Sequence, residues 1–150
     1  MKKSLLIELI RALIILLFLS ASLSKFISIK GFEGDMRNQV FPMWMAEVLT
    51  IVVPVTEIII VGLLYFDKTR LIGFYASAVL MTLFTIYTAT VLTGVYGRIP
   101  CSCGGVIRKL SWKQHMILNI FFVLISLIAI AFERKIKILP RDNAGAAENL

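Results

Sequence analysis

The chain has 150 residues, of which 59% are hydrophobic and 17% are charged, and it carries a formal net charge of +7. Its length allows one domain, and its apolar content exceeds the roughly 45–50% usual in soluble proteins and lies in blocks long enough to cross a bilayer, which excludes a soluble globular protein. The basic residues flank these blocks instead of forming a stripe with interleaved aromatic residues, which argues against a nucleic-acid-binding protein.

The apolar blocks predict an all-α membrane protein, built as a bundle of four transmembrane helices. The expected spans cover about residues 5–23, 44–66, 71–96 and 115–132. Each approaches the roughly 30 Å thickness of the hydrocarbon core, at a rise of about 1.5 Å per residue. The sequence lacks the short alternating segments that build a membrane β-barrel.

The first span begins like a secretory signal peptide. Two lysines precede a Leu/Ile-rich run, and the run is followed by the small residues 20–22. Glu8 and Arg11, however, lie inside the run, and their spacing places them on one helical face. Because such charges are foreign to the apolar region of a signal peptide, we expect an uncleaved first helix.

The distribution of Lys and Arg favours an orientation with both termini inside. The counts on the two sides are nearly equal, but the segments assigned to the inside are shorter and more densely basic. In the inner (plasma) membrane of a bacterium, this orientation places the connection between the third and fourth spans in the periplasm. Disulfide chemistry persists there, whereas cytosolic thiols are kept reduced.

The sequence divides into a membrane domain, residues 1–135, and a tail, residues 136–150. The tail contains Pro140 and Gly145 and has no amphipathic period. We therefore expect it to be a disordered cytoplasmic tail, and we assign it no function.

Cys101 and Cys103 are the two cysteines of the chain, and they lie in the polar connection between the third and fourth spans. One residue separates them, so a bond between them would close a small, strained ring instead of stapling distant segments. Strained or exposed disulfides are labile and oxidising, which indicates thiol–disulfide exchange with a partner. Two other interpretations stay open: half of a metal site, for which His115 is the one imidazole of the chain, and no role at all.

The residues around the two cysteines favour reactivity. Gly104 and Gly105 permit the backbone angles that a tight ring requires, and Pro100 fixes the approach of the chain. Positive charge nearby stabilises the nucleophilic thiolate, and four basic residues flank the pair: Arg98, Arg108, Lys109 and Lys113.

Two further residues are candidates for proton transfer or for a polar pocket. Glu57 lies near the middle of the second span, where an ionisable group is costly and requires a partner. It would relay protons, line a pocket beneath the cysteines, or join neighbouring helices as a packing group. His115 would act as base or acid for a thiol, or lie at the interface as a structural histidine. Spacing alone offers three partners for Glu57: Thr85, Thr88 and Asn119.

Two other patterns favour structural interpretations. Lys25 ends the first span, and we interpret it as an interfacial lysine that reaches toward the headgroups. Thr82, Thr85 and Thr88 recur every three residues, which is more typical of a helix–helix contact than of a substrate path.

Several of these landmarks occur together: Ser22-Leu23-Ser24-Lys25-Phe26, Phe32, Pro54-Val55-Thr56-Glu57, Pro100-Cys101-Ser102-Cys103-Gly104-Gly105, Trp112 and Asn119. This combination resembles the MauE family, a branch of the DoxX-like membrane proteins that is named for methylamine utilisation. The resemblance covers about residues 5–132. It implies a four-helix, redox-associated membrane protein that accompanies a periplasmic thioredoxin-like partner, with Cys101 and Cys103 as the redox pair.

The leading hypothesis is a membrane thiol–disulfide oxidoreductase whose outward Cys-x-Cys pair exchanges electrons with a thioredoxin-fold partner during the maturation of exported proteins. The alternatives are a non-catalytic assembly factor or anchor for a redox partner, and a small transporter that uses Glu57. We expect contacts with the lipid bilayer and this partner, and none with nucleic acid. No cofactor is expected, although a quinone in the bundle stays an open alternative, as do the direction of electron flow and the oligomeric state.

Overall fold

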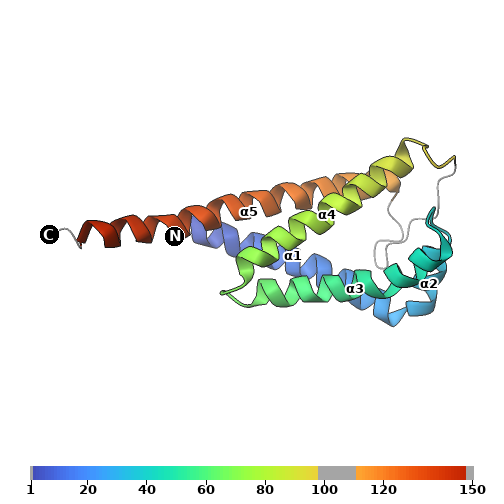
Figure 1. Ribbon diagram of the computed structural model, residues 1–150, viewed down its shortest axis with the longest axis horizontal. Coiled ribbons are helices and arrows are strands. Elements are labelled where there is room, and N and C mark those ends of the chain that lie inside the picture. Colours follow the sequence, from blue (N-terminus) through green and yellow to red (C-terminus); the bar gives the residue numbers. More distant parts are fainter. Residues whose placement is uncertain (1, 98–110, 148–150) are drawn as a thin grey trace.

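The computed structural model describes residues 2–97 and 111–147, with the side chains of residues 5–97 and 111–136. The regular structure of these residues is entirely helical (Figure 1): α1 (Lys2–Ile27), α2 (Ile29–Arg37), α3 (Met43–Tyr65), α4 (Arg70–Leu92) and α5 (Trp112–Ala147). Four segments are long and apolar enough to cross a membrane: Leu5–Ile27, Met43–Tyr65, Arg70–Leu92 and Trp112–Ile136. The predicted all-α fold with four spans is confirmed.

Two ends of the predicted spans differ from the observed helices. α1 continues to Ile27, beyond the expected end at residue 23, because no residue before Ser28 interrupts the helix. At Ser28 the backbone leaves helical geometry, with φ −122° and ψ 52°. α4 ends at Leu92, before the expected end at residue 96, and is followed by Gly94 with φ +72°. Glycine adopts this left-handed conformation without steric cost, so it ends the helix readily.

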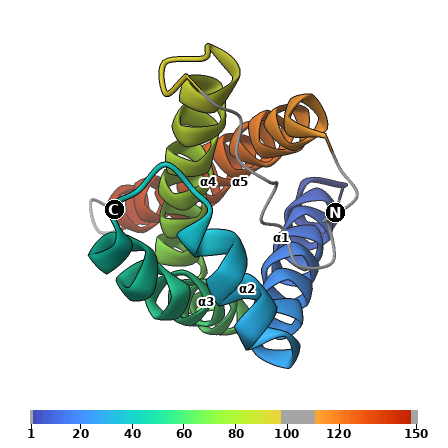
Figure 2. The same cartoon turned by 90° about the vertical axis from the view of Figure 1, so that its right-hand side faces the viewer.

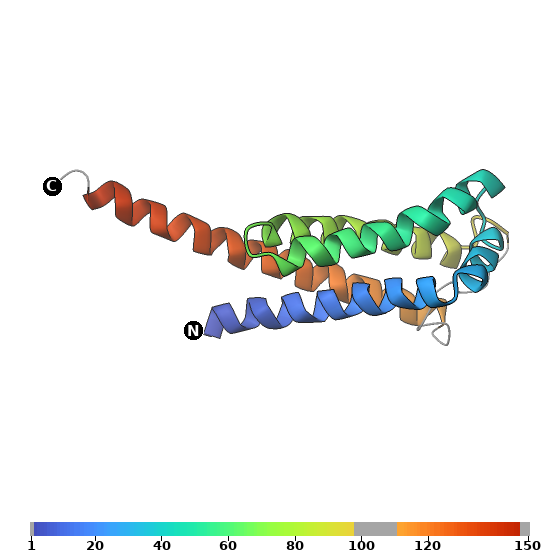
Figure 3. The same cartoon turned by 90° about the horizontal axis from the view of Figure 1, so that it is seen from below.

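α2 is a short amphipathic helix that the apolar blocks of the sequence do not predict. Phe32 and Met36 lie on one face of it, four residues apart, and pack against Ala46 of α3. The helix lies across the adjoining ends of α1 and α3 (Figures 2 and 3). Its buried face closes one end of the bundle, which we call the α2 end.

The long helices form a ring in the order α1, α3, α4, α5, with α5 next to α1 again (Figure 2). The end of α4 and the start of α5 lie at the α2 end (Figure 1). The turn between α3 and α4 and the start of α1 lie at the opposite end, beyond which the last part of α5 extends (Figure 3). Residues 98–110 therefore connect two helix ends that both lie at the α2 end.

The apolar core runs along the inner faces of these helices. On α1, Ile7, Ile10, Ile14 and Phe18 are buried at spacings of three and four residues, which define one helical face. They pack against buried residues of the other long helices: Ile60, Leu64, Phe74, Ala78, Met81, Phe122, Ala129 and Ile130. Many large apolar side chains are exposed on the outer faces, as expected where a helix contacts lipid.

A network of ion pairs joins the helices at the end opposite α2. Arg11 lies 3.1 Å from Glu8 and 2.8 Å from Asp67, and it also donates to backbone carbonyls at the end of α3. Arg70 lies 3.1 Å from Glu8 and 3.0 Å from Glu133. The network thus connects α1, the α3–α4 turn, α4 and α5, and it explains why charged residues occur near the start of an apolar first helix.

The backbone of α5 continues as helix through residues 136–147, where the sequence predicts a disordered tail. The last residues of this segment include several alanines, which have the highest helix propensity. The division of the chain into a membrane domain (1–135) and a cytoplasmic tail (136–150) stays a prediction.

Gly73 marks a close approach of α4 to α3. A Cβ atom at this position would lie 2.8 Å from the Cγ atom and 2.9 Å from the backbone nitrogen of Leu64. Because backbone cannot move aside as a flexible side chain can, we expect Gly73→Ala to lower the free energy of unfolding by about 1–3 kcal/mol. Circular dichroism of thermal unfolding in detergent micelles measures the loss.

Gly62→Ala in α3 is the matched control, since a Cβ atom at position 62 meets nothing within 4 Å. It should leave stability unchanged or raise it slightly, because alanine favours the helix over glycine. Equal unfolding midpoints for the two variants would contradict the close packing at Gly73.

Candidate functional site

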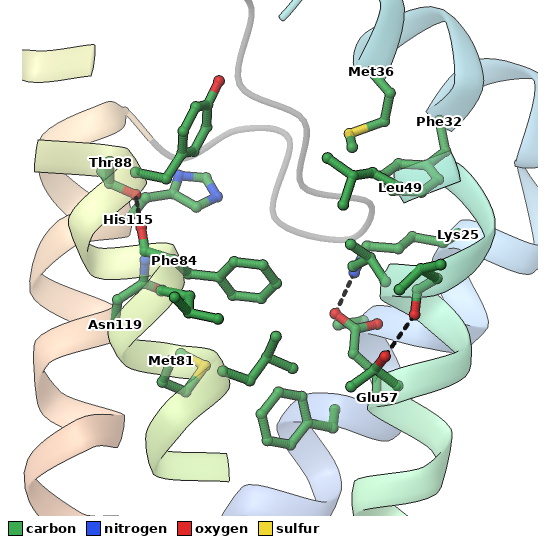
Figure 4. A pocket seen from close by; sticks show the side chains of 18 of the residues that line it. Lys25, Phe32, Met36, Leu49, Glu57, Met81, Phe84, Thr88, His115 and Asn119 are labelled. Atoms are coloured by element: carbon green, nitrogen blue, oxygen red, sulfur yellow. Dashed lines mark hydrogen bonds and ion pairs between the residues drawn. The ribbon is translucent and has the colours of Figure 1, made fainter. Parts of the chain in front are cut away.

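A cavity of about 510 Å³ lies between the helices at the α2 end (Figure 4). Side chains from all five helices line it, and most of them are apolar. The lining includes six aromatic residues: Phe18, Phe32, Phe41, Phe84, Tyr87 and Trp112. Its other polar and charged residues are Lys25, Thr56, Glu57, Thr88, His115 and Asn119. The fold therefore brings Glu57 and His115, two residues that the sequence singled out separately, to one site.

Lys25 and Glu57 form a buried ion pair at this cavity. The Nζ atom of Lys25 lies 2.6 Å from Oε1 of Glu57, and the two side chains are 9% and 2% exposed. The same Nζ lies 5.6 Å from the ring centre of Phe32, within the range of a cation–π contact. The pair joins α1 to α3, and α2 covers it with an aromatic ring. Since a buried charge without its partner is costly, this contact fixes how the three helices meet.

The interpretation of Lys25 as an interfacial lysine is wrong. Because α1 continues past it, Lys25 lies within the helix and is 8% exposed. It shares a face with Phe18 and Ser22, both buried, which lie seven and three residues before it. That spacing, together with the requirement of Glu57 for a cationic partner inside the membrane, is the sequence signal that would have identified the pair.

The three partners that spacing suggested for Glu57 bond elsewhere. Thr85 and Thr88 each donate, at 2.7 Å, to the carbonyl four residues earlier in α4. Asn119 donates to the hydroxyl of Thr88 at 3.4 Å. Glu57 instead pairs with Lys25 through Oε1, while its Oε2 is buried and has no hydrogen-bond partner among the described residues. The cavity wall therefore offers an acceptor that no described protein group uses.

His115 lies across the cavity from the ion pair. Figure 4 shows Lys25 and Glu57 on one side, with His115 and Asn119 on the other. Nδ1 of His115 lies 3.3 Å from the carbonyl oxygen of Ser111, at the start of α5. His115 and Glu57 thus line the same space from opposite walls, and their roles in proton transfer stay predictions.

Tyr87 connects three parts of the fold beside the cavity. Its ring centre lies 4.9 Å from that of Phe41 and 6.1 Å from that of Trp112, in stacked and edge-on contacts. Its hydroxyl donates to Oε1 of Gln39 at 2.6 Å. These contacts attach the α2–α3 connection to α4 and to the start of α5.

Cys101 and Cys103 lie outside the described residues, together with the basic residues at 98, 108 and 109. Their pairing and reactivity stay predictions. The structure does describe where their segment rejoins the bundle: Trp112, the first residue of α5, lines the cavity. The first helical residue after the segment with the two cysteines therefore lies at the cavity wall.

Comparison with known proteins adds one finding. A family model described as "Methylamine utilisation protein MauE" matches residues 3–132. The match covers the first three spans and most of the fourth. No curated protein and no solved structure was found to match. The resemblance to MauE is confirmed, and the wider relationship to DoxX-like proteins stays a prediction.

Replacing one member of the buried ion pair should be far more harmful than replacing both. We expect Lys25→Met and Glu57→Met each to lower the free energy of unfolding by about 3–5 kcal/mol, because each leaves a buried charge without a partner. The double variant should recover most of this loss. Unfolding of the purified protein in mixed micelles of increasing SDS content measures all three.

The exposed pair Arg37–Glu33, at 2.6 Å with side chains 46% and 42% exposed, is the matched control. Arg37→Ala should change stability by less than about 1 kcal/mol. Losses that simply add in the Lys25→Met/Glu57→Met double variant would show that the two side chains do not interact.

Proposed function

The chain belongs to the MauE family of methylamine utilisation proteins, and we propose that it is a membrane thiol–disulfide redox protein. In this proposal, Cys101 and Cys103 exchange electrons with a thioredoxin-fold partner while exported proteins mature. The protein lies in the inner membrane of a bacterium with both termini inside. The α2 end and the segment with the cysteines then face the periplasm.

One observation carries the proposal. The two cysteines of the chain are one residue apart and belong to the segment between α4 and α5, whose far end is at the wall of a cavity that contains a buried ion pair. A dithiol with this spacing has little use as a structural cross-link, and the basic residues in its segment favour the thiolate. Function in membrane proteins is commonly found beside buried ionisable groups.

The exchange itself requires no group beyond the thiols. A thiolate of the pair attacks one sulfur of the partner's disulfide, and the partner's other sulfur leaves as a thiolate. The second cysteine then attacks the mixed disulfide, which forms the Cys101–Cys103 bond and releases the reduced partner. Two electrons pass from this protein to the partner, and the reverse sequence passes them back.

Single cysteine variants should capture the intermediate. In Cys103→Ser or Cys101→Ser, the cysteine that would resolve the mixed disulfide is missing, so one of the two should accumulate a covalent complex with the partner. Non-reducing electrophoresis of membranes quenched with acid and alkylated, followed by mass spectrometry, detects the complex. Reduction should dissociate it.

The double Cys101→Ala/Cys103→Ala variant is the control, and it should form no complex. The same variant distinguishes the alternative function. If it restores full activity to cells that lack the protein, the chain acts as an assembly factor or anchor and the redox proposal fails. If neither single variant forms a complex, the redox proposal fails as well.

The proposed orientation is tested by single exposed cysteines placed at the two ends of the bundle. In a cysteine-free background, Lys30→Cys lies on α2 and Lys68→Cys lies in the α3–α4 turn, and both positions are exposed. A membrane-impermeant maleimide added to intact cells should label Lys30→Cys and should label Lys68→Cys only after lysis. The reverse pattern would place the α2 end in the cytosol.

A further inference from the structure

We propose that the cavity at the α2 end binds a neutral lipid with a flat, oxygen-bearing ring, of the quinone and quinol class, and that Lys25 and Glu57 contact the ring oxygens. The binding site is inferred from the cavity alone. Its use in electron transfer rests on the proposed thiol–disulfide function.

The shape and lining of the cavity favour a flat ring. Its volume of about 510 Å³ lies within the roughly 300–1,000 Å³ of sites for small molecules. Aromatic side chains line it on several sides, with Phe18 on α1, Phe32 on α2 and Phe84 on α4. Aromatic rings stack or meet edge-on with other rings, which gives a ring-shaped ligand more contact than a flexible aliphatic chain.

The polar atoms of one wall form an adjacent donor and acceptor. Lys25 has three N–H groups, and the described hydrogen bond to Oε1 of Glu57 uses one of them. Oε2 of Glu57 is buried, has no hydrogen-bond partner among the described residues, and belongs to a residue that lines the cavity. A ring carbonyl can accept from Lys25, and a ring hydroxyl can donate to Oε2 of Glu57. A quinone presents the first group and its quinol presents the second.

The charge of the site favours a neutral ligand. Lys25 and Glu57 already neutralise each other at 2.6 Å. Among the described residues, the lining includes no further Lys or Arg, so these residues offer a phosphate or carboxylate no spare cation. Placing an unpaired charge beside a buried ion pair is costly, whereas a neutral ring with hydrogen-bonding oxygens loses little solvation.

A bound quinone would complete the chemistry of the proposed function. The Cys101 and Cys103 thiols lose two S–H bonds and form one S–S bond, which releases two electrons and two protons. The quinone takes up both and gains two O–H bonds as a quinol. No further reactant is required, and the ligand would be oxidant and proton acceptor at once.

Binding can be followed through Trp112, which lines the cavity. The chain has two tryptophans, and the other, Trp44, is 66% exposed. In a Trp44→Phe background, titration of the purified protein in nanodiscs with decylubiquinone should quench the fluorescence of Trp112 in a saturable manner. In a Trp112→Phe background, the remaining Trp44 should show only the unsaturated quenching of a probe that dissolves in lipid.

Three variants in the Trp44→Phe background locate the site. Lys25→Met/Glu57→Met removes donor and acceptor together without leaving a buried charge, and it should weaken binding about tenfold or more, the contribution of a hydrogen bond to a charged group. Ala21→Phe keeps the ion pair but fills part of the cavity, and it should weaken binding as well. Glu133→Gln is the matched control: Glu133 is also buried, its Oε2 has no hydrogen-bond partner within the described part of the chain, and it does not line the cavity, so binding should be unchanged.

The outcomes separate this proposal from the proposed function. Equal, unsaturated quenching of Trp44 and Trp112, or displacement of the probe by decanol at equal concentration, would overturn the site. Binding that is unchanged by both Lys25→Met/Glu57→Met and Ala21→Phe would overturn it too. Cys101→Ser/Cys103→Ser should bind decylubiquinone like the parent. If it does and no mixed disulfide forms with any partner, the binding site stands and the redox function falls.

Discussion

A charge buried within a membrane protein requires an opposite charge beside it, and this requirement acts on Lys25 and Glu57. The two residues are 32 positions apart in the chain and meet at 2.6 Å. For them to meet, α1 has to continue past its apolar run, turn the face of Lys25 inward and lie against the middle of α3. α2 then packs over the pair, with the ring of Phe32 near the ammonium group. The cavity lies between this pair and residues of α4 and α5.

The two ends of the bundle use charge differently. At the end opposite α2, several carboxylates and two arginines share contacts, and Asp67 remains 77% exposed. At its exposed carboxylates, Glu8 and Asp67, water can replace a lost partner. At the α2 end, one lysine and one glutamate pair inside an apolar lining, where water cannot easily do so. The first arrangement holds helix ends together, whereas the second places a donor and an acceptor where a ligand can reach them.

The four spans could be predicted because each is a long apolar block, and the bilayer sets their length. α2 could not, since a helix of nine residues with charged residues on one side produces no such signal, and its two buried residues, Phe32 and Met36, become informative only once α3 is known. The sequence alone predicts an interfacial Lys25, because a lysine near the end of a span usually reaches the headgroups. The sequence shows that Glu57 needs a partner inside the membrane, but the identity of that partner depends on how α1 and α3 meet, which a single sequence does not state. The sequence predicts that His115 and Trp112 lie at the start of the fourth span. Only the fold shows that they line a cavity together with Glu57.

The separation of Lys25 and Glu57 along the chain has a consequence for biosynthesis. The ribosome completes α1 well before α3 is released, so for that interval the lysine has no carboxylate to pair with. Its long side chain then has to reach the headgroup region, where water and lipid phosphates solvate the ammonium group. Only when α3 enters the membrane can α1 move so that the lysine becomes buried. Insertion of the first helix and its final seating are therefore separate steps, and the second waits for a glutamate that the first does not contain.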